Sequence, residues 1–116
     1  MRLDHVQIAI PAGGESEARS FFGDLLGLSE IPKPAGTQGR GGCWFQLEDR
    51  QLHLGVDPDF RPAKKAHVAL AVPDLESLRA KLSDAGYEFT EEAQLNGRER
   101  FFSTDPFGNR MEFVAD

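Results

Sequence analysis

The sequence predicts an α+β fold made of two tandem β-α-β-β-β modules. An internal repeat is the first observation behind this prediction, because segment 5–11, HVQIAIP, resembles segment 67–73, HVALAVP. Later in each half, Leu52-His53-Leu54 resembles Met111-Glu112-Phe113 in the same order. The length is the second observation, since 116 residues with 40% hydrophobic and 28% charged residues suit one globular domain.

The repeat also sets the domain organisation. We place the first module at residues 1–57 and the second at residues 66–116, joined by a linker at 58–65. Together they form a single domain, 1–116, because each half alone is too short for an independent core.

The first module begins with a strand, since residues 3–10 alternate and are rich in β-forming side chains. A helix is expected over 15–26, where apolar residues recur at helical spacing. A short strand at 29–31 and a hairpin of strands 42–48 and 51–56 complete the module. The residues of the helical face are Ala18, Phe21, Phe22, Leu25 and Leu26, and the hairpin turns at Asp49-Arg50.

The second module repeats this order. A strand at 66–72 precedes a helix that Asp74 caps and Gly86 ends, as Gly27 ends the first helix. Three further strands follow near 87–91, 99–103 and 110–114.

Two polar segments have less regular patterns. Segment 32–40 has no good counterpart in the second module and is rich in Pro and Gly, which predicts a mobile surface loop. It is either an exposed connection or a lid over a site. The run Arg98-Glu99-Arg100 is typical of a solvated edge strand.

Four polar side chains lie on strand faces opposite those that pack on the helices. Because side chains alternate along a strand, these four point to the face opposite that of their apolar neighbours. They are His5, His53, His67 and Glu112, and they include all three histidines of the chain. His5 matches His67 in the repeat, and His53 matches Glu112. If the modules curl into one cup, the four groups can bind a divalent metal such as Zn, Ni, Mn, Fe or Co.

Further residues share this face and are candidates for contact with a substrate. The hairpin turn at 49–50 pairs His53 with Gln46, whereas a three-residue loop would bring Cys43 and Phe45 to the face instead. Arg110 suits an anionic substrate or a salt bridge at the rim. The candidate substrate-binding residues are Gln7, Gln46, Trp44 and Arg110.

At these residues the chain resembles the vicinal oxygen chelate superfamily of glyoxalases, bleomycin-resistance proteins and dioxygenases. The resemblance covers nearly the whole chain. It rests on LDHV at 3–6, QLHL at 51–54, AHVAL at 66–70 and DPFGNRMEF at 105–113. The last segment is similar to the family's D-P-x-G-N-x-x-E signature.

The resemblance implies a glyoxalase-like curved mixed sheet around an open cavity that holds a metal. His5, His67 and Glu112 match the family's two-histidine, one-carboxylate ligand set. His53 stands where glyoxalase I has a glutamate and methylmalonyl-CoA epimerase a glutamine, so it is either a ligand or a hydrogen-bonding partner of the substrate. Many short members complete the cavity with a second subunit, so a homodimer is expected.

The resemblance also implies a reaction type. We expect a divalent-metal-dependent enzyme, in which the metal acts as a Lewis acid on a small oxygen-rich substrate. Lyase or isomerase chemistry of the glyoxalase type would use Glu112 as the base. The alternatives are a non-catalytic drug- or metabolite-binding protein of the bleomycin-resistance type, and a fosfomycin-resistance-like transferase or a dioxygenase.

Composition excludes several other classes. The net charge of −6, without a long basic stripe, argues against nucleic acid as a partner. No apolar run approaches the roughly 20 residues of a membrane span, and no signal peptide is expected. Cys43 is the only cysteine, so no internal disulfide can form, and this favours the cytoplasm. Cys43 is also a poor candidate for a nucleophile.

Overall fold

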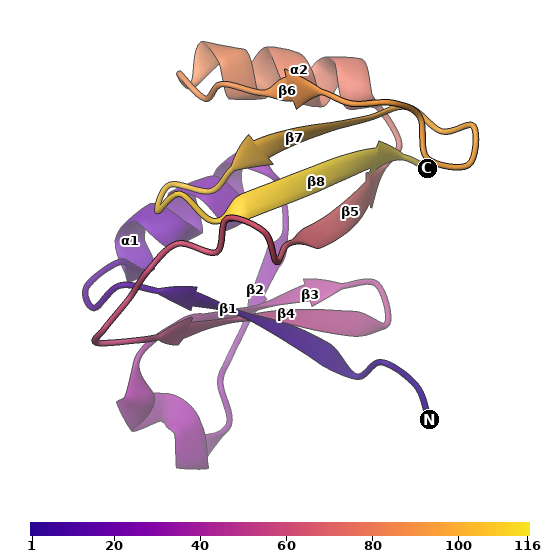
Figure 1. The fold of residues 1–116 in the computed structure, drawn as a ribbon. Coiled ribbons are helices and arrows are strands. Elements are labelled where there is room, and N and C mark those ends of the chain that lie inside the picture. The colour runs from indigo at the N-terminus through magenta and orange to yellow at the C-terminus, as the bar shows by residue number, and fades with distance from the viewer. The chain divides into compact units, whose positions relative to one another are not determined.

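The computed structural model describes residues 1–116 and divides into two compact units, Met1–Pro62 and Ala63–Asp116. Each unit has one four-stranded mixed sheet, and its elements follow the order β-α-β-β-β (Figure 1). The predicted α+β fold of two tandem modules is therefore confirmed. The boundary between the units lies within the segment predicted as a linker.

The sheet of the first unit contains β1 (His5–Ile10), β2 (Ser29–Ile31), β3 (Cys43–Leu47) and β4 (Arg50–Val56). Its order is β1-β4-β3-β2. Strand β1 runs parallel to β4, and the other neighbours are antiparallel. The parallel pair at one side of the sheet is what a β-α-β-β-β order requires, because the helix carries the chain back before the hairpin forms.

The first helix differs from the expected α-helix in its winding. Helix α1 (Glu15–Ala18) continues as π-helical turns over Arg19–Leu25, where the N–H of Leu26 bonds the carbonyl of Phe21 at 2.9 Å. A wider turn reduces the angle between successive side chains, so both Phe21 and Phe22 remain buried. The spacing of apolar residues cannot distinguish this winding from an α-helix.

The helix covers only one face of the first sheet. The ring of Phe22 lies 6.0 Å from that of Phe45 on β3. Phe45 pairs with Leu52, which in turn pairs with Val6, so these side chains share the covered face. The opposite face belongs to the alternate residues of the same strands.

The second unit repeats the arrangement. Its elements are β5 (Val68–Val72), α2 (Leu75–Asp84), β6 (Thr90–Glu91), β7 (Arg100–Thr104) and β8 (Arg110–Ala115). The sheet order is β5-β8-β7-β6, with β5 parallel to β8. The strand expected over 87–91 has only its last two residues in the ladder, because the preceding chain lines a groove instead.

Helix α2 begins and ends as its sequence predicts. The side chain of Asp74 accepts a hydrogen bond from the N–H of Ser77 at 3.0 Å, which caps the first turn. Gly86 has a φ of +85°, as Gly27 has +76°, so both stop positions use the left-handed conformation that glycine tolerates. The helix buries Leu75, Leu78 and Leu82. None of the helices combines the length and apolar character that a bilayer crossing demands.

The hairpin of the first unit turns one residue earlier than expected. Leu47 pairs with Arg50, so the turn is Glu48-Asp49 rather than Asp49-Arg50, and Glu48 takes the left-handed φ of 49°. His53 consequently lies opposite Trp44, not opposite Gln46. The correction changes the partner by two residues and preserves the face, so Trp44 and Gln46 share the face of His53 as predicted.

Segment 32–40 is also more regular than a loop. It contains a 3-10 helix, Ala35–Arg40, whose first turn is closed by a hydrogen bond from the N–H of Thr37 to the carbonyl of Pro34 at 2.9 Å. None of the helical residues is buried. The expected surface location is confirmed, and the proline at its N-terminal side suits the start of a helix.

A buried turn between β7 and β8 ties β8 to the chain that enters β5. Asp105 and Asn109 are 1% and 2% exposed. The Asp105 carboxylate accepts hydrogen bonds from the N–H groups of Phe107 and Asn109 at 2.9 Å and from Nδ2 of Asn109 at 2.8 Å. Oδ1 of Asn109 accepts from the N–H of Ala63 at 2.9 Å. Burial raises the pKa of Asp105, and these hydrogen bonds oppose that rise.

Replacing Asn109 tests this connection. Asn109→Ala leaves the N–H of Ala63 and one oxygen of Asp105 without their partner, so we expect a loss of about 2 kcal/mol in the free energy of unfolding. Chemical denaturation followed by circular dichroism measures the change. The exposed amide Gln94 is the control, and Gln94→Ala should change stability little. Equal stability of Asn109→Ala and wild type would contradict this role.

The burial of Cys43 predicts that its thiol is unreactive in the folded chain. Cys43 is 1% exposed on the helix-covered face, and burial raises the pKa of its thiol to about 11. The thiol stays protonated up to that pH in the folded chain, so a disulfide reagent at pH 8 should react only after unfolding in guanidinium. Rapid reaction of one thiol per native chain would show that this strand opens readily.

Candidate functional site

The open face of the first sheet gathers the polar residues of its strands. Gln7 pairs with His53, which pairs with Trp44 across the hairpin. His5 pairs with Gln51 in the next row of the same face. Directly paired residues point to the same side of a sheet, so the predicted face is present in this unit.

Three aromatic rings on this face form a stack. The Trp44 and His53 rings lie 3.6 Å apart at an interplanar angle of 2°. The His5 ring lies against His53 at 4.2 Å and 21°. His53 is the middle ring and is only 5% exposed, whereas His5 is exposed. Both faces of the His53 imidazole are therefore covered, and only its edge is available for a polar contact.

Hydrogen bonds set the tautomers of the two imidazoles. Nδ1 of His5 donates to Oδ2 of Asp4 at 2.9 Å, which leaves Nε2 as the acceptor in the neutral ring. Nε2 of His53 donates to Oε1 of Gln51 at 2.8 Å, which leaves Nδ1 as its acceptor. Burial and then the charge of His5 lower the pKa of His53, so this ring is neutral at neutral pH. Neutral imidazole is the form that binds metals.

The second unit holds the other two predicted ligands in direct contact. Nε2 of His67 lies 3.0 Å from Oε2 of Glu112. Nδ1 of His67 donates to the backbone carbonyl of Lys65 at 2.9 Å, which fixes the ring. Glu112 is 4% exposed, and its other oxygen, Oε1, accepts from Arg100 at 3.2 Å.

This contact places two acceptors face to face. The carbonyl of Lys65 can only accept, so Nδ1 of His67 carries the hydrogen and Nε2 of the neutral ring presents its lone pair to Glu112. A lone pair and a carboxylate oxygen at 3.0 Å repel unless a cation lies between them. A divalent metal can supply that cation, because imidazole and carboxylate are both metal ligands.

Arg100 belongs to this site, and the prediction that it lies on a solvated edge strand is wrong. Strand β7 lies between β6 and β8, so Arg100 is not on an edge. Its guanidinium reaches the buried carboxylate of Glu112, while Arg98 bonds the carbonyl of Ala115 at the exposed surface. A run of alternating charges usually indicates exposed side chains. It does not show that one of them, here Arg100, pairs with a buried acid on the neighbouring strand.

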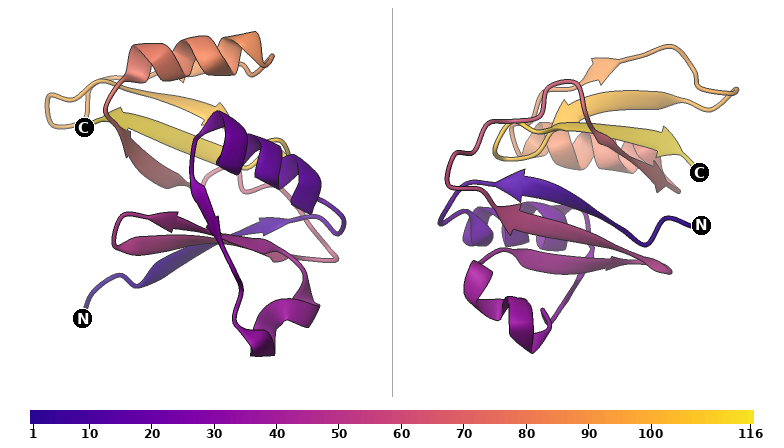
Figure 2. Two further views of the ribbon diagram at one scale, coloured as in Figure 1. Left: turned by 180° about the vertical axis from the view of Figure 1, so that it is seen from behind. Right: turned by 60° about the horizontal axis from the view of Figure 1, so that its bottom comes forward.

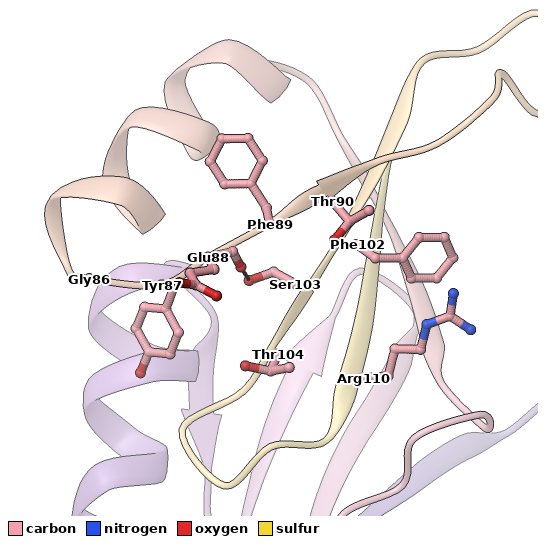
Figure 3. A pocket seen from close by; sticks show the side chains of 9 residues that line it. All are labelled: Gly86, Tyr87, Glu88, Phe89, Thr90, Phe102, Ser103, Thr104 and Arg110. Carbon is pink, nitrogen blue, oxygen red and sulfur yellow. Dashed lines mark hydrogen bonds between the residues drawn. The ribbon is translucent and has the colours of Figure 1, made fainter.

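The second unit also has a groove of about 500 Å³, and one of its lining residues, Phe102, pairs with Glu112 in the ladder (Figure 3). Arg110 and Phe102 line it together with Tyr87 and Thr104. The guanidinium of Arg110 lies 3.8 Å above the Phe102 ring and forms no ion pair. Phe102 pairs with Glu112 as Trp44 pairs with His53, so the internal repeat carried the signal that could have identified it.

Of the remaining candidates, Gln46 is partly committed to the fold. Its Nε2 donates to the carbonyls of Glu48 at 2.6 Å and Arg50 at 3.0 Å, which closes the hairpin turn. Only its Oε1 is left for a ligand. The structure thus pairs His5 with His53 in one unit and His67 with Glu112 in the other, and no group of three metal-binding side chains occurs in it.

The sequence matches the family model described as Glyoxalase/Bleomycin resistance protein/Dioxygenase superfamily over residues 2–113. A comparison with curated protein sequences finds no match. The structure is similar to that of a glyoxalase family protein from Bacillus anthracis, with 42% identity and a TM-score of 0.93 over 100% of this chain and 95% of that chain.

More distant solved structures share the fold. A member of the same superfamily from Sphaerobacter thermophilus has 18% identity and a TM-score of 0.77 over 100% of this chain and 98% of its own. A lactoylglutathione lyase from Agrobacterium tumefaciens has 18% identity and a TM-score of 0.69 over 95% of this chain and 91% of its own. With a family model that matches nearly all of its length, the chain belongs to the Glyoxalase/Bleomycin resistance protein/Dioxygenase superfamily, also called the vicinal oxygen chelate superfamily.

Proposed function

We propose that this protein is a divalent-metal-dependent enzyme of the glyoxalase type that acts on a small oxygen-rich substrate. His5, His67 and Glu112 would hold the metal, and the edge of His53 offers a fourth contact to metal or substrate. The observation that carries the proposal is the acceptor pair of the second unit, in which Nε2 of His67 faces Oε2 of Glu112 at 3.0 Å.

The donor set fits a borderline divalent cation. Imidazole nitrogen and carboxylate oxygen suit Zn, Ni, Mn, Fe and Co. The hydrogen bonds of His5 to Asp4 and of His67 to Lys65 hold the far nitrogens, so the Nε2 atoms are the free ligands. A metal bound there would supply Lewis-acid polarisation of a substrate oxygen.

Glu112 is the candidate base. Arg100 holds Oε1, so Oε2 is the oxygen that would bind the metal and that, after shifting off the metal, would accept a proton from a carbon next to a substrate carbonyl. Return of that proton to a neighbouring atom completes an isomerisation.

Three side chains on the open faces support substrate binding. Gln7 offers an amide beside His53, and Trp44 offers the ring face that does not contact His53. Arg110 offers a guanidinium without an acidic partner at the groove of the second unit. Gln46 contributes its Oε1 alone, because its nitrogen holds the hairpin turn.

Metal analysis tests the proposal. Protein purified without a histidine tag should bind about one divalent ion per chain after incubation with Ni, Mn, Fe or Zn. His5→Ala, His67→Ala and Glu112→Gln should each weaken binding more than about tenfold, because each removes a ligand. Glu99→Gln, which removes an exposed carboxylate, is the matched control and should bind like wild type. Wild type that stays metal-free with every ion would reject the enzyme and favour a ligand-binding protein.

The proposal includes a homodimer in which the two ligand pairs of a site come from different chains. Mixing and refolding His5→Ala with Glu112→Gln then creates heterodimers with one intact site, so metal binding should recover to about a quarter of wild type. The control mixture, His67→Ala with Glu112→Gln, alters the same unit twice and should recover nothing. No recovery in the first mixture would place all ligands of a site in one chain.

A further inference from the structure

A small cavity of about 150 Å³ in the first unit has four polar or charged side chains in its lining, those of Gln7, Lys33, Thr37 and Arg40. One wall is the 3-10 helix Ala35–Arg40, which projects from the strands of its unit (Figure 2). The other walls come from β1, β3 and β4 of the same unit. This helix belongs to the segment that the second module lacks, so the cavity is a feature of the first module alone.

Two cations face this cavity without an acidic partner. Lys33 and Arg40 both line it, and neither forms an ion pair. The ammonium of Lys33 donates to the backbone carbonyl of Gly41, which holds it at the wall. The nearby carboxylate of Glu15 accepts from the N–H of Gly42 at 3.3 Å instead of pairing with either cation. In a chain with 19 acidic and 13 basic residues, two cations at one cavity that form no ion pair favour an anionic occupant.

A neutral donor completes the wall. The amide of Gln7 lies directly over Gly55, where an added Cβ would approach its Nε2 to 2.7 Å. Glycine at position 55 therefore leaves room for the Gln7 amide beside the two cations. Together they offer ammonium, guanidinium and amide donors, which match the oxygens of a carboxylate or a phosphate.

Trp44 connects the cavity to the histidines. It lines the cavity, and one face of its ring lies against His53, which in turn lies against His5. The Trp44 ring thus lies between an anionic group in the cavity and the two histidines of this unit. A small elongated molecule can span that distance along the open face.

We infer that the Lys33–Arg40 cavity binds the anionic head group, a carboxylate or a phosphate, of the substrate whose other end reacts at the histidine face. The reacting end rests on the proposed function. The anion site itself rests only on the cavity, its two cations and the Gln7 amide. Lys33, Arg40 and Gln7 would thereby select the substrate without taking part in the reaction.

The fluorescence of Trp44 provides the test, because it is the only tryptophan of the chain and lines the cavity. Metal-free protein in chelator is titrated with inorganic phosphate and, separately, with acetate, while sodium chloride keeps the ionic strength constant. We expect a saturable fluorescence change with at least one anion. Arg40→Ala and Lys33→Gln should raise its Kd by at least about tenfold, because each loses a charged donor.

Arg61→Ala is the matched control, since it removes an exposed arginine outside the cavity and should leave the Kd unchanged. Saturation by phosphate alone identifies a phosphate ester, and saturation by acetate identifies a carboxylate. A linear response to both anions, or equal Kd values for Arg40→Ala and wild type, would overturn the inference. Metal loading of Arg40→Ala should match wild type, so a failure of the metal site and a failure of the anion site give different results.

Discussion

In each unit a parallel pair of strands carries the functional face, with Gln7 opposite His53 in the first unit and Ala69 opposite Glu112 in the second. Because side chains alternate, a slip of one residue in either pair would turn the candidate ligand toward the helix. The covered faces prevent such a slip, since Phe45 and Leu52 in one unit and Phe101 and Phe113 in the other are buried. Packing on one face therefore sets the chemistry of the other.

The parts of the fold that follow from alternation were predictable from sequence. The repeat and the element order followed from the resemblance between the two halves, and the placement of Trp44 and Gln46 on the face of His53 needed only the period of two and the parity of the hairpin. The π-helical turns and the exact hairpin turn were not predictable, because the spacing of apolar residues is shared by both windings and the turn places a non-glycine residue, Glu48, at a positive φ. The pairing of Arg100 with Glu112 was missed for a similar reason, since a run of charges looks the same whether or not one member reaches a buried acid.

The two units differ in how they hold their candidate ligands. In the first unit the imidazoles stack, and burial keeps His53 neutral by lowering its pKa. In the second unit His67 and Arg100 share the two oxygens of Glu112, so the carboxylate is fixed before any ligand binds.

Comparison of the two modules within one chain separates the positions of the candidate metal ligands, which repeat, from neighbouring positions that differ between the modules. His5 and His67 are equivalent, as are the aromatic residues Trp44 and Phe102 that pair with His53 and Glu112. The residues around these positions have diverged, since Gln51 corresponds to Arg110, and the Ala35–Arg40 helix has no counterpart. The cations without acidic partners, Arg110 in one unit and Arg40 in the other, lie at these diverged places. In a chain that is acidic overall, such cations at two of its cavities make these the places where the local charge favours an anion.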